Sequence, residues 1–209
     1  MHVLITGGAG YIASLLTGLL RQRGHTVTVV NDLRFGGQSL LGYCHHPCFR
    51  FVTANVADAA AFPPRLCREV DAVVHLAAMV GFPACQAVGQ QVARRYHVEA
   101  VHHVFAAAEE AGVPRFVFSL TYSTYYSTYG LARNGEPVTG HAPLSPQSLY
   151  AETKSAAEQY LVERARSARG APGIGRFATL CGISPRACFD LIINQFVLEA
   201  LTRRGLVIY

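Results

Sequence analysis

Short apolar runs alternate along the chain with longer segments in which apolar residues recur every three to four positions. The short runs predict β-strands at residues 3–6, 26–30, 49–53, 71–76, 115–119 and 174–179. The longer segments predict helices at residues 13–23, 59–70 with an interruption near Pro63 and Pro64, 92–111, 148–169 and 187–204. Strands that alternate with helices form parallel sheets through right-handed crossovers. The pattern therefore predicts an α/β fold of the Rossmann type, a doubly wound parallel sheet with helices on both faces.

The length and composition suit one domain of this kind. The chain has 209 residues, of which 51% are hydrophobic, enough for a single sizeable core. No apolar run approaches the roughly 20 residues that a membrane-spanning helix needs. The apolar start passes directly into Gly7 and Gly8, without the basic stretch and the cleavage site of a signal peptide. We therefore expect a cytoplasmic protein that does not associate with membranes.

The charged and metal-binding side chains favour neither nucleic acid nor metal as a partner. The net charge is +5, but the Lys and Arg residues are dispersed, whereas nucleic-acid binding needs them clustered beside exposed aromatic residues. Residues 44–48 include two cysteines and two histidines, yet no second pair follows at zinc-ligand spacing. We predict a loop at this segment, no metal site and no binding to nucleic acid.

The turn between the first predicted strand and the first predicted helix is rich in glycine. Residues 6–13 are Thr-Gly-Gly-Ala-Gly-Tyr-Ile-Ala. Gly7 allows a tight turn, and Gly10 allows backbone N–H groups to approach a phosphate. The positive end of the following helix faces the same phosphates. Placed between a strand and a helix, this turn predicts dinucleotide binding at Gly7, Gly10, Tyr11 and Ile12.

Tyr150 and Lys154 form a second chemical signal. They are spaced i and i+4, so they share one face of a predicted helix. A free tyrosine has a pKa of about 10, and a nearby ammonium group stabilises the phenolate and lowers that pKa. The pair alone is common on exposed helices. After a glycine-rich turn and alternating strands, it predicts a general base, Tyr150, assisted by Lys154.

These motifs and their order resemble the extended short-chain dehydrogenase/reductase family, and in particular its NAD-dependent epimerases and dehydratases of sugar nucleotides. The resemblance covers nearly the whole chain, although Ala13 stands where a third glycine is usual. It implies NAD as the cofactor, with Lys154 also holding the nicotinamide ribose. It also implies a catalytic hydroxyl group after the fifth strand. Counting forward from the strand selects Thr121, which we prefer, with Ser123 in reserve, whereas counting backward selects Tyr125, which lacks this chemistry.

The resemblance implies further contacts with the cofactor. Asn31 falls at the position of the acidic residue that binds the adenosine ribose, and Asp32 follows it. Asp32 favours NAD, whereas Arg34 leaves NADP open, and a simple turn is the alternative interpretation of Asn31 and Asp32. The remaining implied contacts are with adenine, by Asn55 and Val56, and along the cofactor, by Leu76, Ala77 and Ala78.

The implied reaction is hydride transfer at a hydroxyl-bearing carbon of a sugar nucleotide. Relatives that dehydrate sugars often carry an acidic residue after the catalytic threonine, but here Tyr122 and Ser123 follow Thr121. We therefore favour an epimerase or a reductase. The expected substrate contacts are Thr121, Ser123 and Asn194. His97 replaces an asparagine that is usual on the long helix, and we assign it no catalytic role.

Family members normally continue beyond the position of Tyr209. We expect residues 1–180 to form the NAD(P)-binding domain and residues 181–209 to begin a truncated substrate-binding lobe that is largely missing. A catalytically weak or inactive dinucleotide-binding module is one alternative function, and a reductase of a non-nucleotide carbonyl is another. The family resemblance also implies a homodimer, in which the predicted helices 92–111 and 148–169 pair with their symmetry mates as a four-helix bundle.

Overall fold

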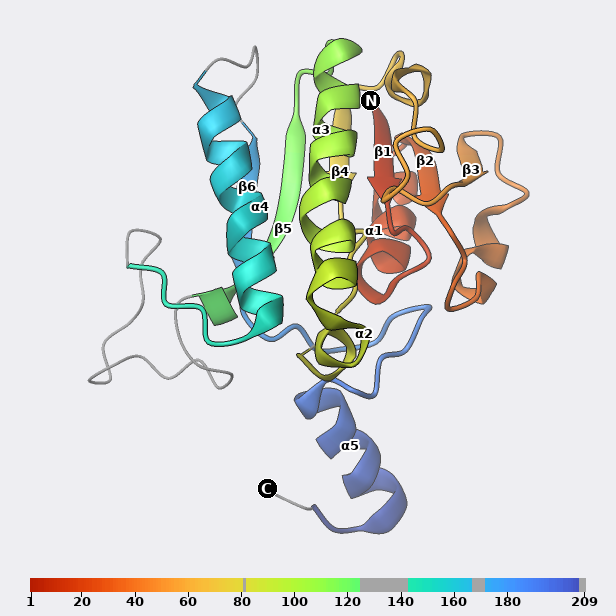
Figure 1. Ribbon diagram of the computed structural model, residues 1–209. Helices are drawn as coiled ribbons and strands as arrows, with labels where there is room; N and C mark the ends of the chain where they lie inside the picture. The colour runs from red at the N-terminus through yellow and green to blue at the C-terminus, as the bar shows by residue number, and fades with distance from the viewer. Residues whose placement is uncertain (81, 125–142, 167–171, 207–209) are drawn as a thin grey trace.

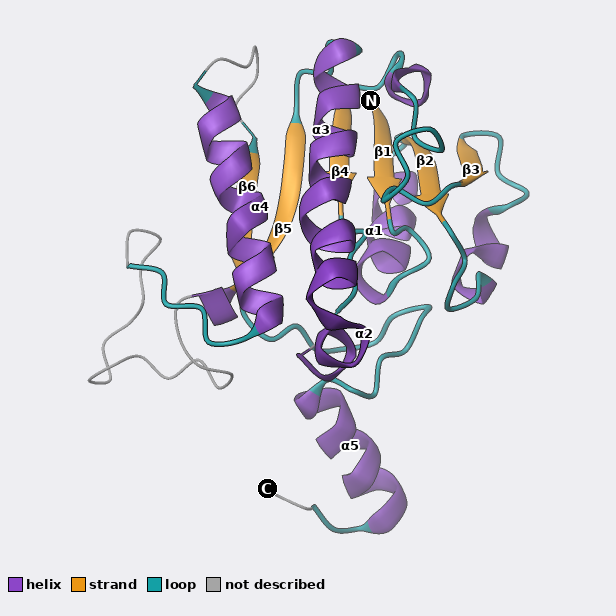
Figure 2. Cartoon of the chain, in the orientation of Figure 1, coloured by secondary structure: helices purple, strands orange, loops and turns teal. Residues whose placement is uncertain are grey.

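The computed structural model describes residues 1–80, 82–124, 143–166 and 172–206, which contain one six-stranded sheet (Figures 1 and 2). The strands lie in the order β3-β2-β1-β4-β5-β6, and each neighbouring pair is parallel. Their bounds are His2–Thr6 for β1, Thr26–Asn31 for β2, Phe49–Thr53 for β3, Ala72–His75 for β4, Phe116–Thr121 for β5 and Gly173–Phe177 for β6. This strand order reverses between β1 and β4, as in the Rossmann fold, so the predicted fold class is confirmed.

Helices cover both faces of the sheet because alternate side chains of its central strands point to opposite sides. In β1, Leu4 belongs to one core, whereas Val3 and Ile5 belong to the other. The core of Leu4 includes residues of α3 (Ala100–Glu110) and α4 (Leu149–Ala165), and the core of Val3 includes residues of α1 (Tyr11–Gln22). Figure 1 shows α3 and α4 in front of the sheet and α1 behind it.

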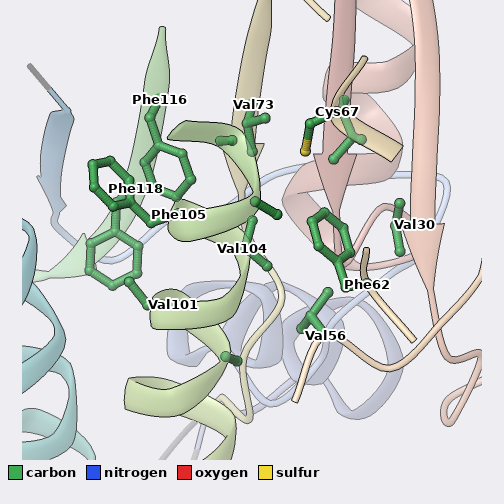
Figure 3. Close-up of a cluster of buried hydrophobic side chains, with 14 of the residues drawn as sticks. Val30, Val56, Phe62, Cys67, Val73, Val101, Val104, Phe105, Phe116 and Phe118 are labelled. Atoms are coloured by element: carbon green, nitrogen blue, oxygen red, sulfur yellow. The ribbon is translucent and has the colours of Figure 1, made fainter. Parts of the chain in front are cut away.

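The larger core is aromatic near β5. The ring of Phe105, on α3, meets that of Phe116 edge to face with the centroids 5.0 Å apart, and Phe118 lies beside them (Figure 3). Phe62 and Cys67 fill the part of this core nearer β2. This apolar cluster packs α3 and α4 against one face of the sheet.

The predicted helix at residues 59–70 is wrong. In its place, only the 3-10 turn η2 (Pro64–Cys67) is helical. Pro63 and Pro64 are the physical cause, because proline has no N–H to donate to a preceding turn. The segment still buries Phe62 and Cys67, so its apolar pattern reflects core packing without a regular helix.

The predicted helix at 92–111 corresponds to the end of α2 (Phe82–Arg94), a π-helical segment η3 (Arg95–Glu99), and α3. Sequence analysis missed the start of α2 because glycine and proline usually interrupt helices. Gly89 adopts a positive φ of 80° within α2 and forms a kink there. α3 ends at Glu110, one residue before the predicted end, and Gly112 follows with a positive φ of 73°.

The predicted helix at 148–169 is α4, and its first residue follows Ser148, whose side chain accepts a hydrogen bond from the N–H of Ala151 at 3.2 Å. Residues 167–169 of the predicted range lie outside the described residues. The last helix, α5 (Ile192–Arg203), begins five residues later than the predicted 187. There the side-chain amide of Asn194 donates to the carbonyl of Cys188 at 2.9 Å and holds the intervening residues in a turn.

The chain beyond β6 differs from the rest because its large apolar side chains are exposed. Figure 1 shows α5 extending away from the sheet. The exposed apolar residues of this part are Leu180, Ile183, Phe189, Ile192, Ile193, Val197, Leu198, Leu201 and Leu206. Among the helices that the structure describes, none has the length and apolar character to cross a membrane.

Candidate active site

The glycine-rich turn packs directly against the end of β4. The N–H of Gly7 donates to the carbonyl of Val30 at 2.8 Å, and Gly7 has a positive φ of 70°. A Cβ atom at Gly7 would lie 2.7 Å from the backbone N and Cα of Ala77. Only glycine fits both the conformation and the space at this position. The N–H of Gly10 donates to the carbonyl of Gly7 at 2.9 Å, which closes the turn at the N-terminus of α1.

Gly8 is a structural requirement that sequence analysis did not assign. A Cβ atom there would lie 2.2 Å from Cγ1 of Val29 on β2. Ala13, at the usual place of a third glycine, is 1% exposed and belongs to the same core as Val29. The methyl group of Ala13 is therefore accommodated, and α1 still packs closely on the sheet. The position of Gly8 next to Gly7 was the only sequence signal for this requirement. The close approach of Val29 on β2 becomes visible only in the folded chain.

The segment after β4 lies beside the glycine turn, as the motif suggested. The N–H of Leu76 donates to the carbonyl of Thr6 at 3.2 Å, and the N–H of Ala77 donates to the Thr6 hydroxyl at 3.3 Å. The same hydroxyl lies 2.9 Å from Nδ1 of His75. His75 was not singled out from the sequence. Burial, and secondarily the charge of Lys154, lower the pKa of His75 to about 3, so its ring is neutral.

The residues expected to bind the ribose are bonded to their own loop. The side-chain oxygen of Asn31 accepts from the N–H of Leu33 at 2.7 Å. The carboxylate of Asp32 accepts from the N–H of Arg34 at 3.2 Å and lies 3.6 Å from the guanidinium Nε. These bonds form the turn that sequence analysis gave as an alternative. They leave the outer face of Asp32, which is about one third exposed, at the carboxyl end of β2.

Tyr96 joins the expected ribose and adenine positions, although sequence analysis did not select it. The guanidinium of Arg34 stacks over the Tyr96 ring at 4.7 Å and donates to its hydroxyl. The amide nitrogen of Asn55 also donates to that hydroxyl at 3.3 Å, and its oxygen accepts from the N–H of Ala57 at 2.9 Å. Val56 is buried in the core, so only its backbone could meet a ligand.

Lys154 is held at the carboxyl end of β5. It is 5% exposed, and its ammonium donates to the carbonyl of Ser119 at 2.9 Å and lies 4.7 Å above the ring of Phe118. Burial lowers the pKa of Lys154 to about 8. A buried amine with this pKa, next to the end of a central strand, can exchange a proton near neutrality.

Tyr150 does not have the lowered pKa that we expected from its lysine neighbour. In the chain alone, burial and then the Cys85 thiol raise the pKa of Tyr150 to about 12. The ring of Tyr150 packs against the small cluster of Met79, Cys85 and Ala93, and it meets the ring of His97 edge to face at 5.5 Å. The physical reason for the difference is that desolvation opposes the phenolate.

Thr121 ends β5 and is half-buried, with Tyr122, Ser123 and Thr124 following in the 3-10 turn η4 (Tyr122–Thr124). The hydroxyl of Thr124 donates to the carbonyl of Thr121 at 3.0 Å. Thr121 is therefore the last residue of the strand that also contains Ser119, whose carbonyl accepts the hydrogen bond from Lys154. The side chain of Ser123, and the rejected candidate Tyr125, lie outside the described residues.

Asn194 connects the last part of the chain to Tyr11, the first residue of α1. Its amide oxygen accepts from the N–H of Gly182 at 2.9 Å, and its nitrogen donates to the hydroxyl of Tyr11 at 3.2 Å. Tyr11 in turn donates to the carbonyl of Gly182 at 2.7 Å, and the hydroxyl of Ser184 donates to the carbonyl of Tyr11 at 2.6 Å. The amide of Asn194 is thus used within the chain, and its predicted contact with a substrate remains a prediction.

The segment at residues 44–48 contains cysteines with free thiols. Among the described residues, no three His, Cys, Asp or Glu side chains are placed to hold a metal ion together.

Comparison with known proteins shows the family of this chain. The sequence profile of the NAD dependent epimerase/dehydratase family matches residues 3–207. An uncharacterized UDP-glucose epimerase of Bacillus subtilis, YtcB, is 29% identical over all of this chain, which spans 65% of that relative. UDP-glucuronic acid decarboxylase 2 of Arabidopsis thaliana is 27% identical, and the chain spans 45% of it.

Two solved structures show the same arrangement of elements. DesIV, a dTDP-glucose 4,6-dehydratase from Streptomyces venezuelae with NAD bound, superposes with a TM-score of 0.81 at 27% identity, over 96% of this chain and 62% of its own. A UDP-N-acetylglucosamine 4-epimerase from Methanobrevibacter ruminantium gives a TM-score of 0.84 at 23% identity, over 100% of this chain and 65% of its own. The latter likeness establishes the fold alone. The chain thus spans less than two thirds of each of these relatives.

Proposed function

Because this chain belongs to the NAD dependent epimerase/dehydratase family, we propose that it binds NAD and transfers hydride at a hydroxyl-bearing carbon of a sugar nucleotide. The observation that carries the proposal is the meeting of α4 with the carboxyl edge of the sheet. Lys154 donates to Ser119 near the end of β5, and the glycine turn begins at the end of β1. Ligands of doubly wound sheets bind at this edge, where the strand order reverses.

The residues at the glycine turn fit the pyrophosphate of NAD. Gly10 is the N-cap of α1, and it brings no side chain between the helix end and an approaching phosphate. The N-terminal residues Tyr11 and Ile12 add backbone N–H groups, and Leu76, Ala77 and Ala78 would line the cofactor next to Gly7. Asn31, Asp32, Asn55 and Val56 would surround the adenosine half. Asp32 favours NAD over NADP because a carboxylate repels a 2′-phosphate.

Bound NAD would accept or return the hydride at its nicotinamide ring. Tyr150 would take the proton of the substrate hydroxyl, and Thr121, with Ser123 in reserve, would hydrogen-bond the reacting oxygen. Because burial holds the pKa of Tyr150 at about 12, catalysis near neutrality needs positive charge beside the phenol. Lys154, whose pKa is about 8, is mostly protonated at neutral pH and would supply this positive charge. Its ammonium group would also bind the nicotinamide ribose.

The residues that follow Thr121 favour an epimerase or a reductase over a 4,6-dehydratase. Tyr122 and Ser123 follow Thr121, so no carboxylate stands directly after it to assist β-elimination. Asn194 and residues 181–209 would begin the part that binds the sugar nucleotide, beyond the NAD-binding residues 1–180. We further propose a cytoplasmic homodimer in which α3 and α4, adjacent on one face of the sheet, pair with their mates.

Two observations favour a second candidate function, a dinucleotide-binding module with weak or no catalysis. The pKa of Tyr150 is raised, and the amides of Asn55 and Asn194 are occupied by bonds within the chain. In this alternative the chain binds NAD but turns over no sugar nucleotide. Both candidate functions therefore include NAD binding, and they differ in whether Tyr150 acts as a catalytic base.

Calorimetry with NAD and absorbance of reduced nicotinamide during incubation with a panel of sugar nucleotides test the proposal. Tyr150→Phe removes the phenol hydroxyl, and we expect it to abolish turnover while NAD affinity changes less than about threefold. Tyr160→Phe, on the same helix and outside the proposed site, is the matched control and should keep turnover. Binding of NAD without turnover would select the second candidate, and absence of NAD binding would exclude both.

A further inference from the structure

His97 lies beside Tyr150, and sequence analysis left it without a role. It lies in the π-helical segment η3 and is 1% exposed. Its Nε2 lies 2.7 Å from the carbonyl of Met79, and its Nδ1 lies 2.7 Å from the hydroxyl of Thr153. Single π turns in α-helices occur frequently at functional sites, because they redirect side chains.

We propose that His97 is a positioning residue for Tyr150: its neutral ring links Met79, in the loop after β4, to Thr153 on α4 and braces the Tyr150 ring edge-on. Both linked residues adjoin the tyrosine. Met79 packs with Tyr150 in one buried cluster, and Thr153 is its neighbour one turn along α4. This inference rests on the proposed role of Tyr150 as a base, because it says what sets the place of that phenol.

The hydrogen bonds define which ring nitrogen carries the proton. The Met79 carbonyl can only accept, so Nε2 must carry a hydrogen. The Thr153 hydroxyl has one hydrogen, and its oxygen also lies 2.7 Å from the carbonyl of Leu149 and 3.1 Å from that of Tyr150. If this hydrogen went to a backbone carbonyl, Nδ1 would also have to donate, and the ring would be charged.

A charged ring is disfavoured at this place. Burial, and then the positive charge of Lys154, lower the pKa of His97 to about 4, while the bond to Met79 opposes this shift. The other titratable groups near His97 and Lys154 are Tyr150, Cys85 and His75. The charge of Lys154 also lowers the pKa of His75. The ring is therefore neutral at pH 7. In the proposed arrangement the Thr153 hydroxyl then donates to Nδ1 of His97, although it also has donor geometry toward the carbonyls of Leu149 and Tyr150.

The contacts of His97 connect the segment after β4 with α4, and both of these contribute residues to the proposed site. The Met79 carbonyl belongs to the segment that follows the cofactor-lining residues 76–78, and Thr153 belongs to the helix of Tyr150 and Lys154. The Cys85 thiol donates to the same carbonyl at 3.7 Å, so Met79 is held from two sides. Loss of the ring would let α4 shift relative to the cofactor segment, and a displacement of about 1 Å can reduce catalysis on the order of 100-fold.

Nitrogen NMR of the free chain tests the arrangement without requiring turnover. We expect His97 to be the Nε2–H tautomer from pH 7 down to about pH 5, with Nδ1 accepting a hydrogen bond. Thr153→Val should change the Nδ1 resonance, whereas Thr153→Ser should restore it because serine keeps the hydroxyl. An Nδ1–H tautomer, or a ring that is charged at pH 7, would overturn the inference.

Kinetics test the positioning. His97→Leu should lower kcat on the order of 100-fold and change NAD affinity less than about threefold. His97→Asn should retain most of kcat, because an amide can donate to Met79 and accept from Thr153. His103→Asn, further along in α3, is the matched control. Equal kcat in the parent and His97→Leu would refute the positioning role.

Two variants separate this inference from the proposed function. If Tyr150→Phe abolishes turnover and His97→Leu does not, the function stands and the positioning role falls. If Tyr150→Phe leaves turnover unchanged, the proposed function falls, and the role of His97 falls with it whatever tautomer NMR reports. Urea unfolding of His97→Leu shows whether a loss of kcat reflects misfolding, and His97→Asn with restored kcat and equal stability would support positioning.

Discussion

The glycine turn at residues 6–10 leads into α1, whose residues Tyr11 and Ser14 bind the segment at residues 180–206, yet the turn and this segment are held by different forces. Thr6 and Ala9 are almost fully buried, and the turn is confined by β2 and by the segment after β4. The later segment is attached through hydrogen bonds of Tyr11, Ser184 and Asn194, while its large apolar side chains remain exposed.

The helix α5 shows the contrast most clearly. Its most buried side chain is the carboxylate of Glu199, whereas Leu201 is 78% exposed. A stable soluble core has the reverse distribution, with apolar groups inside and charges outside. The difference teaches that the cofactor-side sheet completes its own core, while the segment beyond β6 contributes little to it. Stability should therefore depend on the first region and barely on the second.

The largest effect should come from closing the space at the glycine turn. Gly7→Ala places a methyl group 2.7 Å from the backbone of Ala77 at a φ of 70°. We expect a loss of about 4 kcal/mol in the free energy of unfolding, from left-handed strain and steric overlap together, and loss of NAD binding. Urea unfolding and calorimetry measure the two effects.

Gly24→Ala is the control for this substitution. Gly24 has a similar φ of 78°, but a methyl group there would meet nothing within 4 Å. It should cost only about 1 kcal/mol, which is the strain without the overlap. Equal losses at both positions would show that the close approach to Ala77 does not matter.

The second test makes one chemical change in each of the two regions. Leu4 is fully buried in β1, so Leu4→Ala should cost about 3 kcal/mol through lost burial and a cavity. Leu201→Ala removes the same atoms from an exposed position of α5, and we expect a change below about 0.5 kcal/mol. Chemical denaturation of both variants gives the comparison. A large loss at Leu201 would mean that α5 is part of the cooperative core.

Acid should weaken the cofactor-side region through its buried histidines. The pKa values of His75 and His97 fall from 6.5 to about 3 and about 4, so between pH 6.5 and these values the unfolded chain binds more protons than the folded chain. Stability is therefore complete above pH 6.5 and decreases as the pH falls. Each histidine should contribute a loss of about 2 kcal/mol between pH 7 and pH 5.

Unfolding free energies at pH 7 and pH 5 measure this slope. His75→Phe should remove roughly half of it, because a phenylalanine ring fills the place between Phe116 and Phe118 without titrating. The exposed His45→Gln is the control and should leave the slope unchanged. The assignment fails if the parent and His75→Phe lose the same stability on acidification.

The smallest effect concerns the choice of dinucleotide. Asp32→Ala removes the carboxylate that lies 3.6 Å from Arg34, so the guanidinium becomes available to a 2′-phosphate. We expect NAD affinity to fall about tenfold, or about 1.4 kcal/mol, and NADP affinity to rise. Calorimetry with both cofactors checks this, with Asp58→Ala as a control beyond β3. Unchanged NADP affinity would show that Arg34 does not face the ribose.

Local patterns predicted the strands and most helices because periodicity and breaker residues act over short stretches. The helix predictions that were wrong failed at proline and glycine residues. Pro63 and Pro64 prevented a helix whose apolar spacing was helical, and Gly89 sits inside a helix at a kink that its positive φ permits. The positions of Gly7, Tyr150 and Lys154 were likewise visible as motifs, since their spacing is tied to one turn or one helix.

What the amino-acid sequence determined by itself is the order of elements, the glycine turn and the spacing of Tyr150 and Lys154. What only the tertiary structure decided is which groups surround them. His97 meets Thr153 across 56 residues, Asn55 meets Tyr96 across 41, and Tyr11 meets Gly182 across 171. The pKa of Tyr150 also depends on the assembled surroundings, because burial and then the Cys85 thiol raise it. Periodicity is a property of adjacent residues, whereas desolvation and hydrogen-bond partners exist only once distant segments have packed together.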